Sequence, residues 1–288
     1  MPKLTRRNAL AALAPVVGAG VAAKLSGFPS GAAAAPETAP DDMAGMDHGS
    51  FGFRKGAKVD NTANGFDPME VLRDFDEGTT RRLANGRVVR EWEMVATDKD
   101  IEVAPGITYA GWSYNDRIPG PTLRAKEGEL LRIRFVNGTQ QPHTIHFHGV
   151  HASLQDGVPG LGAGLIEPGA STTYEFEAKP FGLHLYHCHA SPLADHITKG
   201  LYGAFLIDPK EGRPEADEMV MVMNGFDTNF DRSNEVYAAN SVGFAYTERP
   251  IQVRCNELMR ISMIPRWPWH SITESVNSDG SSFVPVGK

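Results

Sequence analysis

The sequence LYHCHASPLADH, residues 185–196, places one of only two cysteines of the chain between two histidines. His187 precedes Cys188, His189 follows it, and His196 comes later in the same stretch. The residues that lead up to Cys188 have the composition of a short β-strand. Successive side chains of a strand point to opposite faces, so His187 and His189 share one face and Cys188 points to the other. One strand is therefore predicted to supply two different sites.

A second histidine-rich stretch, PHTIHFHGVH at residues 142–151, provides the partners. By the same alternation, His146 and His148 share a face, and His143 has the opposite parity if the strand is regular. The arrangement that satisfies both stretches puts His143 beside Cys188 on the inward side. His146 and His148 then join, on the outward side, the two histidines that flank the cysteine.

We predict an inward set formed by His143, Cys188 and His196. His196 reaches this set if Ser191 caps a short helical turn that Pro192 opens, because the turn brings the chain back. Two imidazoles and one thiolate form the trigonal donor set of a blue copper centre. A catalytic zinc ion is the alternative for one cysteine and two histidines, but zinc alone leaves the second histidine set unexplained.

The outward set contains only imidazoles, which are donors that suit copper. Its members are His146, His148, His187 and His189. A cluster of several copper ions needs more than four ligands, so the remaining ligands are expected from another domain or another chain. Two neighbouring histidines, His151 at the end of the second stretch and His184 just before the first, are expected to have ordinary structural roles.

Short strands separated by turns dominate the sequence beyond Val88. The strands are rich in alternating apolar residues, and the turns between them include IPGP at 118–121 and EPG at 167–169. About seven strands at this spacing predict an all-β fold, a β-sandwich that covers residues 86–212.

A second series of strands is expected over residues 213–264. Residues 265–288 lose all alternation and are too few to complete a domain, so we predict an incomplete second domain followed by an irregular tail. In the alternative interpretation, the strands of 213–264 simply extend the first domain. The sequence is expected to be truncated or frame-shifted after Ile264.

The N-terminal region is typical of an export signal over residues 1–35. Arg6 and Arg7 form a twin-arginine-like pair, an apolar run follows, and small residues at 32–35 suit a signal peptidase. A membrane anchor is the alternative, although the apolar run is shorter than the ~20 residues that a span requires. The predicted location is periplasmic or secreted, with no membrane association after cleavage. Residues 36–85 are expected to be a linker with a short helix, in which Asp67 is the cap and Pro68 the first residue.

Charge and cysteine content exclude some classes of function. The formal net charge is −7 and there is no long block of Lys and Arg, which argues against a nucleic-acid partner and favours small neutral or cationic substrates. A disulfide between Cys188 and Cys255 is possible in an exported protein but is disfavoured by the histidines around Cys188. Cys255 is expected to be a buried thiol in a strand.

Five motifs together resemble the multicopper oxidase family, in particular its small two-domain bacterial members. They read IPGPTLRAKEGELLRIRFVNGT, HTIHFHGVH, DGVPG, IEPGASTTYEFEA and HLYHCHASPLADHITKGLYGAFLIDP, and lie within residues 90–210. The resemblance implies a cupredoxin-like Greek-key β-sandwich that binds copper. It also implies that the inward set holds a type 1 copper and that the outward set provides half the ligands of a type 2/type 3 trinuclear cluster.

The resemblance further implies an activity and partners. In such oxidases a small-molecule or metal-ion reductant gives electrons one at a time to the blue copper, and the cluster reduces dioxygen to water. Asp156 matches an acid that relays protons near the cluster, although an Asp-Gly turn explains it equally well. The two-domain members build their cluster between subunits, which implies a homotrimer.

Two departures keep other functions open. Leu201 stands where the family often has an axial methionine, and a copper that lacks this weak ligand is expected to have a raised potential. The second half of domain two, which brings the other cluster histidines in the family, has no counterpart here.

A copper nitrite reductase is one alternative function, although its pattern has an acid in place of His146 and lacks His189. A non-catalytic blue copper electron carrier is the other.

Overall fold

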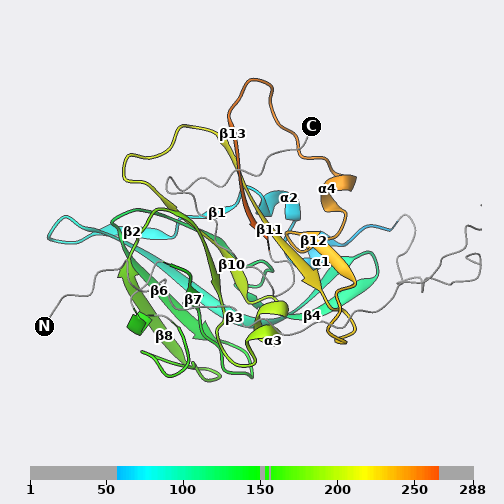
Figure 1. The fold of residues 1–288 in the computed structure, drawn as a ribbon, viewed down its shortest axis with the longest axis horizontal. Helices are drawn as coiled ribbons and strands as arrows, with labels where there is room; N and C mark the ends of the chain where they lie inside the picture. Colours follow the sequence, from blue (N-terminus) through cyan, green and yellow to red (C-terminus); the bar gives the residue numbers. More distant parts are fainter. Residues whose placement is uncertain (1–56, 150–152, 156, 266–288) are drawn as a thin grey trace, which may run out of the picture. The chain divides into compact units, whose positions relative to one another are not determined.

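The computed structural model describes residues 57–149, 153–155 and 157–265. Strands are the main regular structure of this part of the chain, with a few helices of four to six residues (Figure 1). The predicted signal, the tail from residue 266 onward, His151 and Asp156 lie outside the described residues.

Two sheets form a sandwich. In the first sheet the order is β1 (Phe75–Asp76), β5 (Thr122–Lys126), β10 (Tyr202–Asp208), β9 (Gly182–His187) and β7 (His146–Phe147). In the second it is β2 (Thr79–Arg82), β3 (Val88–Ala104), β6 (Leu130–Asn137) and β8 (Ser171–Glu177), and β4 (Ile107–Tyr114) pairs with the later part of β3. The all-β sandwich predicted from the strand spacing is confirmed, and it is cupredoxin-like.

The core of the sandwich comes from alternate residues of these strands. Met94 of β3, Phe135 of β6 and Phe205 of β10 are fully buried in one cluster, and Cys188 belongs to the same cluster. Burial of such side chains is the main stabilising term of the fold, at roughly 25 cal/mol per Å² of apolar surface. The end of β9 is thereby fixed in the interior of the protein.

The strands after residue 216 form a separate sheet. Its order is β12 (Val236–Ala239), β11 (Asp217–Phe226) and β13 (Met259–Pro265), with β13 parallel to β11. A second core cluster joins Val220 and Phe226 of this sheet to Leu185 of β9 and Tyr202 of β10. The three strands therefore pack beside the sandwich without extending either of its sheets.

The expectation for Cys255 was wrong. The predicted strand around it begins only at Met259, and Cys255 lies exposed in a turn. Cys188 and Cys255 are both free thiols. The alternation of valine and arginine before Cys255 imitates a strand, but those residues find no neighbouring strand to pair with in the described part of the chain.

The described residues also form four short α-helices. Two of them precede β1, α1 (Asn61–Asn64) and α2 (Pro68–Val71), and two lie between strands, α3 (Leu193–Thr198) and α4 (Ala245–Glu248). The Asp67 side chain accepts the backbone N–H of Met69, which confirms the predicted cap of α2. At α3 the prediction was shifted by one residue. Pro192, not Ser191, occupies the cap position, and no side chain caps that helix. Among the described residues no helix is long and apolar enough to cross a membrane.

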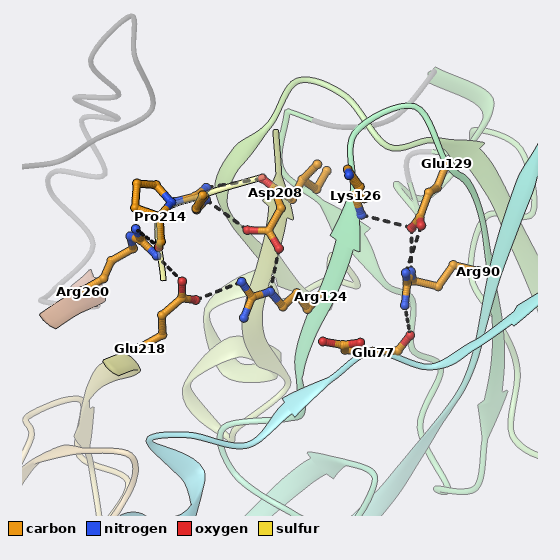
Figure 2. A network of polar contacts seen from close by, with 11 residues as sticks. Glu77, Arg90, Arg124, Lys126, Glu129, Asp208, Pro214, Glu218 and Arg260 are labelled. Atoms are coloured by element: carbon orange, nitrogen blue, oxygen red, sulfur yellow. Dashed lines mark hydrogen bonds and ion pairs between the residues drawn. The ribbon is translucent and has the colours of Figure 1, made fainter. Parts of the chain in front are cut away.

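Arginines link the sandwich to the three-stranded sheet (Figure 2). Arg124 of β5 pairs with Asp208 of β10 at 2.7 Å and with Glu218 of β11 at 3.0 Å. Glu218 also pairs with Arg260 of β13. These side chains are mostly shielded from solvent, so their attraction is screened less than that of surface pairs.

Candidate metal sites

The end of β9 presents its side chains to two sides. Tyr186 and Cys188 belong to the core between the sandwich sheets, whereas Leu185 belongs to the second core cluster. His187 points away from Cys188, toward His148, with 2.8 Å between their Nε2 atoms. The cysteine and its preceding histidine thus face different groups of ligands, as strand alternation requires.

The structure brings the inward set together. The Cys188 Sγ lies 3.4 Å from the His196 Nδ1 and 3.7 Å from the His143 Nδ1, and the two nitrogens are 3.0 Å apart. All three residues are buried. His143 is held where its backbone bridges to Ile166, and His196 comes from α3, so three separate segments meet at this point.

The surroundings of the thiol suit a thiolate ligand. Burial raises the pKa of Cys188, while the backbone N–H groups of Ala190 and Thr144 donate to Sγ at 3.5 and 3.4 Å and oppose that effect. A thiol must lose its proton to bind a metal, and a cation would replace that proton in this buried place.

The two inward imidazoles are held in their neutral forms. Burial, together with the nearby His196, lowers the pKa of His143 to about 3, and burial also lowers the pKa of His196. Both rings are therefore neutral near pH 7, which is the state that binds metals. Their Nδ1 atoms face each other, and one shared hydrogen is the most that fits between them. A metal ion would accept both lone pairs.

The outward set is formed by β7, the residue after it, and the end of β9. His146 pairs with His187 in the strand register, and the ligand atoms of His146, His148 and His187 all lie within 4.8 Å of one another. The His187 Nδ1 donates to the Cys188 carbonyl oxygen at 2.7 Å, which leaves its Nε2 lone pair directed at the group. His189 borders this group, with its ring centroid 5.0 Å from that of His146.

Sequence reasoning missed three residues that support these sets. Thr144 accepts the backbone N–H of His189 on its hydroxyl oxygen at 2.9 Å, and Tyr114 donates to the Thr144 carbonyl oxygen at 2.6 Å. The ring of Trp112 lies 4.9 Å, between centroids, from both inward imidazoles. Thr144 could have been noticed from its place between the histidines of its stretch. Nothing in the sequence connects residues 112 and 114 to the sites.

Two further residues are placed by the structure. Leu201 is fully buried in the same core cluster as Cys188, and its carbonyl oxygen accepts the Cys188 N–H at 3.0 Å. His184 donates to the Pro180 carbonyl oxygen at 3.0 Å and belongs to neither set, in agreement with its predicted structural role.

The donor chemistry of both sets fits copper. A thiolate with two imidazoles suits copper or zinc, whereas a neighbouring set of imidazoles alone favours copper. The convergence of the inward Sγ and Nδ1 atoms, in a buried place with neutral rings, is the observation on which this fit depends.

Comparison with known proteins agrees with the donor sets. The family model described as multicopper oxidase matches residues 96–212. A solved structure described as a multicopper oxidase is 59% identical, with a TM-score of 0.70, and the match covers 72% of this chain and 73% of the other. The chain belongs to the multicopper oxidase family. Its metal is copper.

Curated relatives include more than one kind of copper enzyme. A copper-containing nitrite reductase of Neisseria meningitidis is 33% identical over 135 residues, which are 46% of this chain and 34% of the relative. A multicopper oxidase of Cercospora beticola is 40% identical over 169 residues, which are 54% of this chain and 25% of the relative. The chain therefore spans about a third or less of the length of these two relatives.

Proposed function

We propose that this multicopper oxidase chain couples the one-electron oxidation of a reductant, either a small molecule or a metal ion, to the reduction of dioxygen to water. One observation supports the proposal above all others. A single strand end presents a thiol to one pair of imidazoles and its own neighbouring histidine to another group.

The proposed ligands follow from this division. His143, Cys188 and His196 would hold a type 1 copper, and His146, His148, His187 and His189 would hold half of a trinuclear cluster. When bound, copper accepts electrons singly from the reductant and supplies them to dioxygen.

The residues of the chain have clear tasks in this scheme. The backbone joins Cys188 directly to His187 and His189, so the two sites share the shortest covalent connection that a polypeptide offers. The hydrogen bond from the His187 Nδ1 to the Cys188 carbonyl oxygen would give electrons a shorter path between the two sites than the covalent bonds alone. Burial of His143 and Cys188 excludes water from the inward set. Asp156, which lies outside the described residues, is proposed to deliver protons.

Completion of the outward set needs more ligands than the described residues provide. We propose that a second copy of the chain supplies them in a homotrimer. The mass of the copper-loaded protein in solution, measured by light scattering, tests this assembly. A monomer at working concentration would contradict it.

The central experiment uses both cysteines. The copper-loaded chain should show the intense visible band of a copper–thiolate bond, and Cys188→Ser should abolish it. Cys255→Ser removes the exposed thiol and should leave the band unchanged. Oxygen uptake with a phenolic reductant would then support the oxidase. A band that survives Cys188→Ser would refute the assignment.

Nitrite reduction is the second candidate, because curated relatives are nitrite reductases. Turnover of nitrite with a reduced donor, in the absence of oxygen uptake, would favour it. A visible band with neither reaction would favour a blue copper electron carrier. We further propose that the chain acts in the periplasm or outside the cell, which detection of the processed protein in those fractions would test.

A further inference from the structure

The peptide group between Thr144 and Ile145 lies between the two ligand sets. It follows His143, which belongs to the inward set, and precedes His146, which belongs to the outward set. Both residues of this peptide are fully buried, and they lie between the isolated bridge at His143 and the start of β7, outside any strand ladder. A buried peptide group in such a place needs hydrogen-bond partners from other parts of the chain.

Two tyrosines of the second sheet supply these partners. The hydroxyl of Tyr114, the last residue of β4, donates to the Thr144 carbonyl oxygen at 2.6 Å. The hydroxyl oxygen of Tyr174, in β8, accepts the Ile145 N–H at 3.1 Å. Both sides of one peptide group are therefore held from across the core. The hydroxyls of Tyr114 and Tyr174 are here called the tyrosine clamp.

The two rings of the clamp have little freedom to move. Both are buried in the core cluster of the sandwich, where Tyr114 packs edge-on against Phe135 and Tyr174 against Phe147. Burial raises the pKa of both hydroxyls, to about 12 for Tyr174, so both keep their protons near neutral pH. The clamp is therefore a fixed, uncharged part of the fold near pH 7.

Thr144 connects the clamp to both ligand sets. Its N–H donates to the Cys188 Sγ at 3.4 Å, and its hydroxyl oxygen accepts the His189 N–H at 2.9 Å. A second N–H, that of Ala190, donates to the same sulfur at 3.5 Å from the other histidine stretch. The sulfur carries the most negative charge when the bound copper is Cu(I), so an N–H bond to it stabilises the reduced site and raises the reduction potential.

We propose that the tyrosine clamp positions Thr144, so that the Thr144 N–H points to the Cys188 Sγ and raises the reduction potential of the inward site. Tyr114 and Tyr174 are thus positioning residues. The inference rests on the proposed function, because it takes the inward set to hold a type 1 copper. A merely structural role of the two hydroxyls would affect the stability of the core as a whole and would leave the bond to the sulfur as it is.

The first test needs no copper and follows amide hydrogen exchange by NMR. Tyr114→Phe leaves the Thr144 carbonyl oxygen without its donor, so residue 144 can move away from the sulfur more often. The Thr144 N–H should then exchange on the order of tenfold faster relative to the Ala190 N–H. Ala190 is the internal reference, since a general loss of stability accelerates both groups. A ratio that stays at the parent value overturns the proposal.

The matched control is Tyr186→Phe. The Tyr186 hydroxyl is buried in the same core cluster and donates to the carbonyl oxygen of Pro121, which belongs to neither histidine stretch, at 2.6 Å. This variant removes an equally buried hydroxyl and should leave the exchange ratio unchanged. The same change of the ratio in Tyr186→Phe as in Tyr114→Phe overturns the proposal.

A measurement on the parent protein decides the question should Tyr114→Phe not fold. The Ile145 N–H, although outside a ladder, must be as strongly protected from exchange as the His143 N–H, which donates to the Ile166 carbonyl oxygen at 3.1 Å. Weaker protection of the Ile145 N–H overturns the proposal, because the clamp would then be open in solution.

The second test uses the copper-loaded protein. Tyr114→Phe and Tyr174→Phe should each lower the reduction potential and shift the visible band, because the bond to the sulfur weakens. Tyr186→Phe, in which the ring stays in place, should keep both at the parent values. A potential that is unchanged or higher in the first two variants overturns the inference alone. A parent chain that never develops the band counts against the proposed function instead, and the copper-free exchange ratio then decides on the clamp.

Discussion

At the scale of single residues, Thr144 ties the two histidine stretches together. Its hydroxyl oxygen accepts the His189 N–H, and its own N–H donates to the Cys188 Sγ. Thr144→Val keeps the shape and the second bond but leaves the His189 N–H without its acceptor, so the free energy of unfolding should fall by about 1–3 kcal/mol. Urea denaturation measures this change. Thr80→Val, on exposed β2, should stay within about 0.5 kcal/mol of the parent, and an equal loss in both variants would contradict the role of Thr144.

Leu201 is the second residue whose identity has a measurable consequence. It is buried beside Cys188 in the core and cannot ligate a metal. Leu201→Met offers a thioether at nearly constant volume, at a stability cost below about 1.5 kcal/mol. The reduction potential of the copper-loaded protein should fall, because an added axial ligand favours Cu(II). A redox titration gives the answer, and an unchanged or higher potential would show that residue 201 does not occupy the axial position.

At the scale of elements, the contact between β9 and β10 fixes the end of β9. Gly203 pairs with Tyr186, and a Cβ at 203 would lie 2.2 Å from the Tyr186 hydroxyl oxygen. That hydroxyl donates to the Pro121 carbonyl oxygen at 2.6 Å, so the ring has little freedom to move.

Gly203→Ala should therefore destabilise the protein by about 1–3 kcal/mol, the usual cost of overpacking a core. Because Tyr186 is two residues from Cys188, the visible band of the copper-loaded variant should also shift. Gly243→Ala is the control, since its Cβ would meet nothing closer than 3.4 Å. The melting temperatures of the two variants are compared by thermal unfolding. Equal stability would show that β9 and β10 accommodate the added methyl group at residue 203 without loss of stability.

At the scale of the whole molecule, an ion pair joins α2, near the start of the described chain, to the segment after α4. Asp67 binds Arg249, and this bond holds the pKa of Asp67 below its ordinary value of 3.8. A carboxyl with a lowered pKa in the folded state stabilises that state above its unfolded pKa. The contribution disappears as the pH falls through the folded pKa.

Asp67→Asn keeps a residue that can cap α2 but loses the charge. The stability difference between parent and variant should be largest above about pH 4 and should shrink at lower pH. Urea denaturation between pH 2.5 and 6 follows it. A difference that stays constant over this range would mean that the ion pair does not contribute.

Much of the fold could be predicted because it depends on local patterns. Alternating residues and turn signals gave the sandwich strands, and Asp67 with Pro68 gave the start of α2. Cys255 shows the limit of such reasoning. Its neighbours alternate like a strand, yet a strand forms only where another strand pairs with it.

The division of ligands between two sites was determined by the sequence alone, because alternation along a strand is a property of the covalent backbone and needs no knowledge of distant residues. The tertiary structure decided what surrounds those ligands. It brought Trp112 onto the inward imidazoles from a separate segment, and it closed α3 onto Cys188. Such contacts depend on how sheets pack against one another, and this packing is set by the summed burial of many residues far apart in the chain.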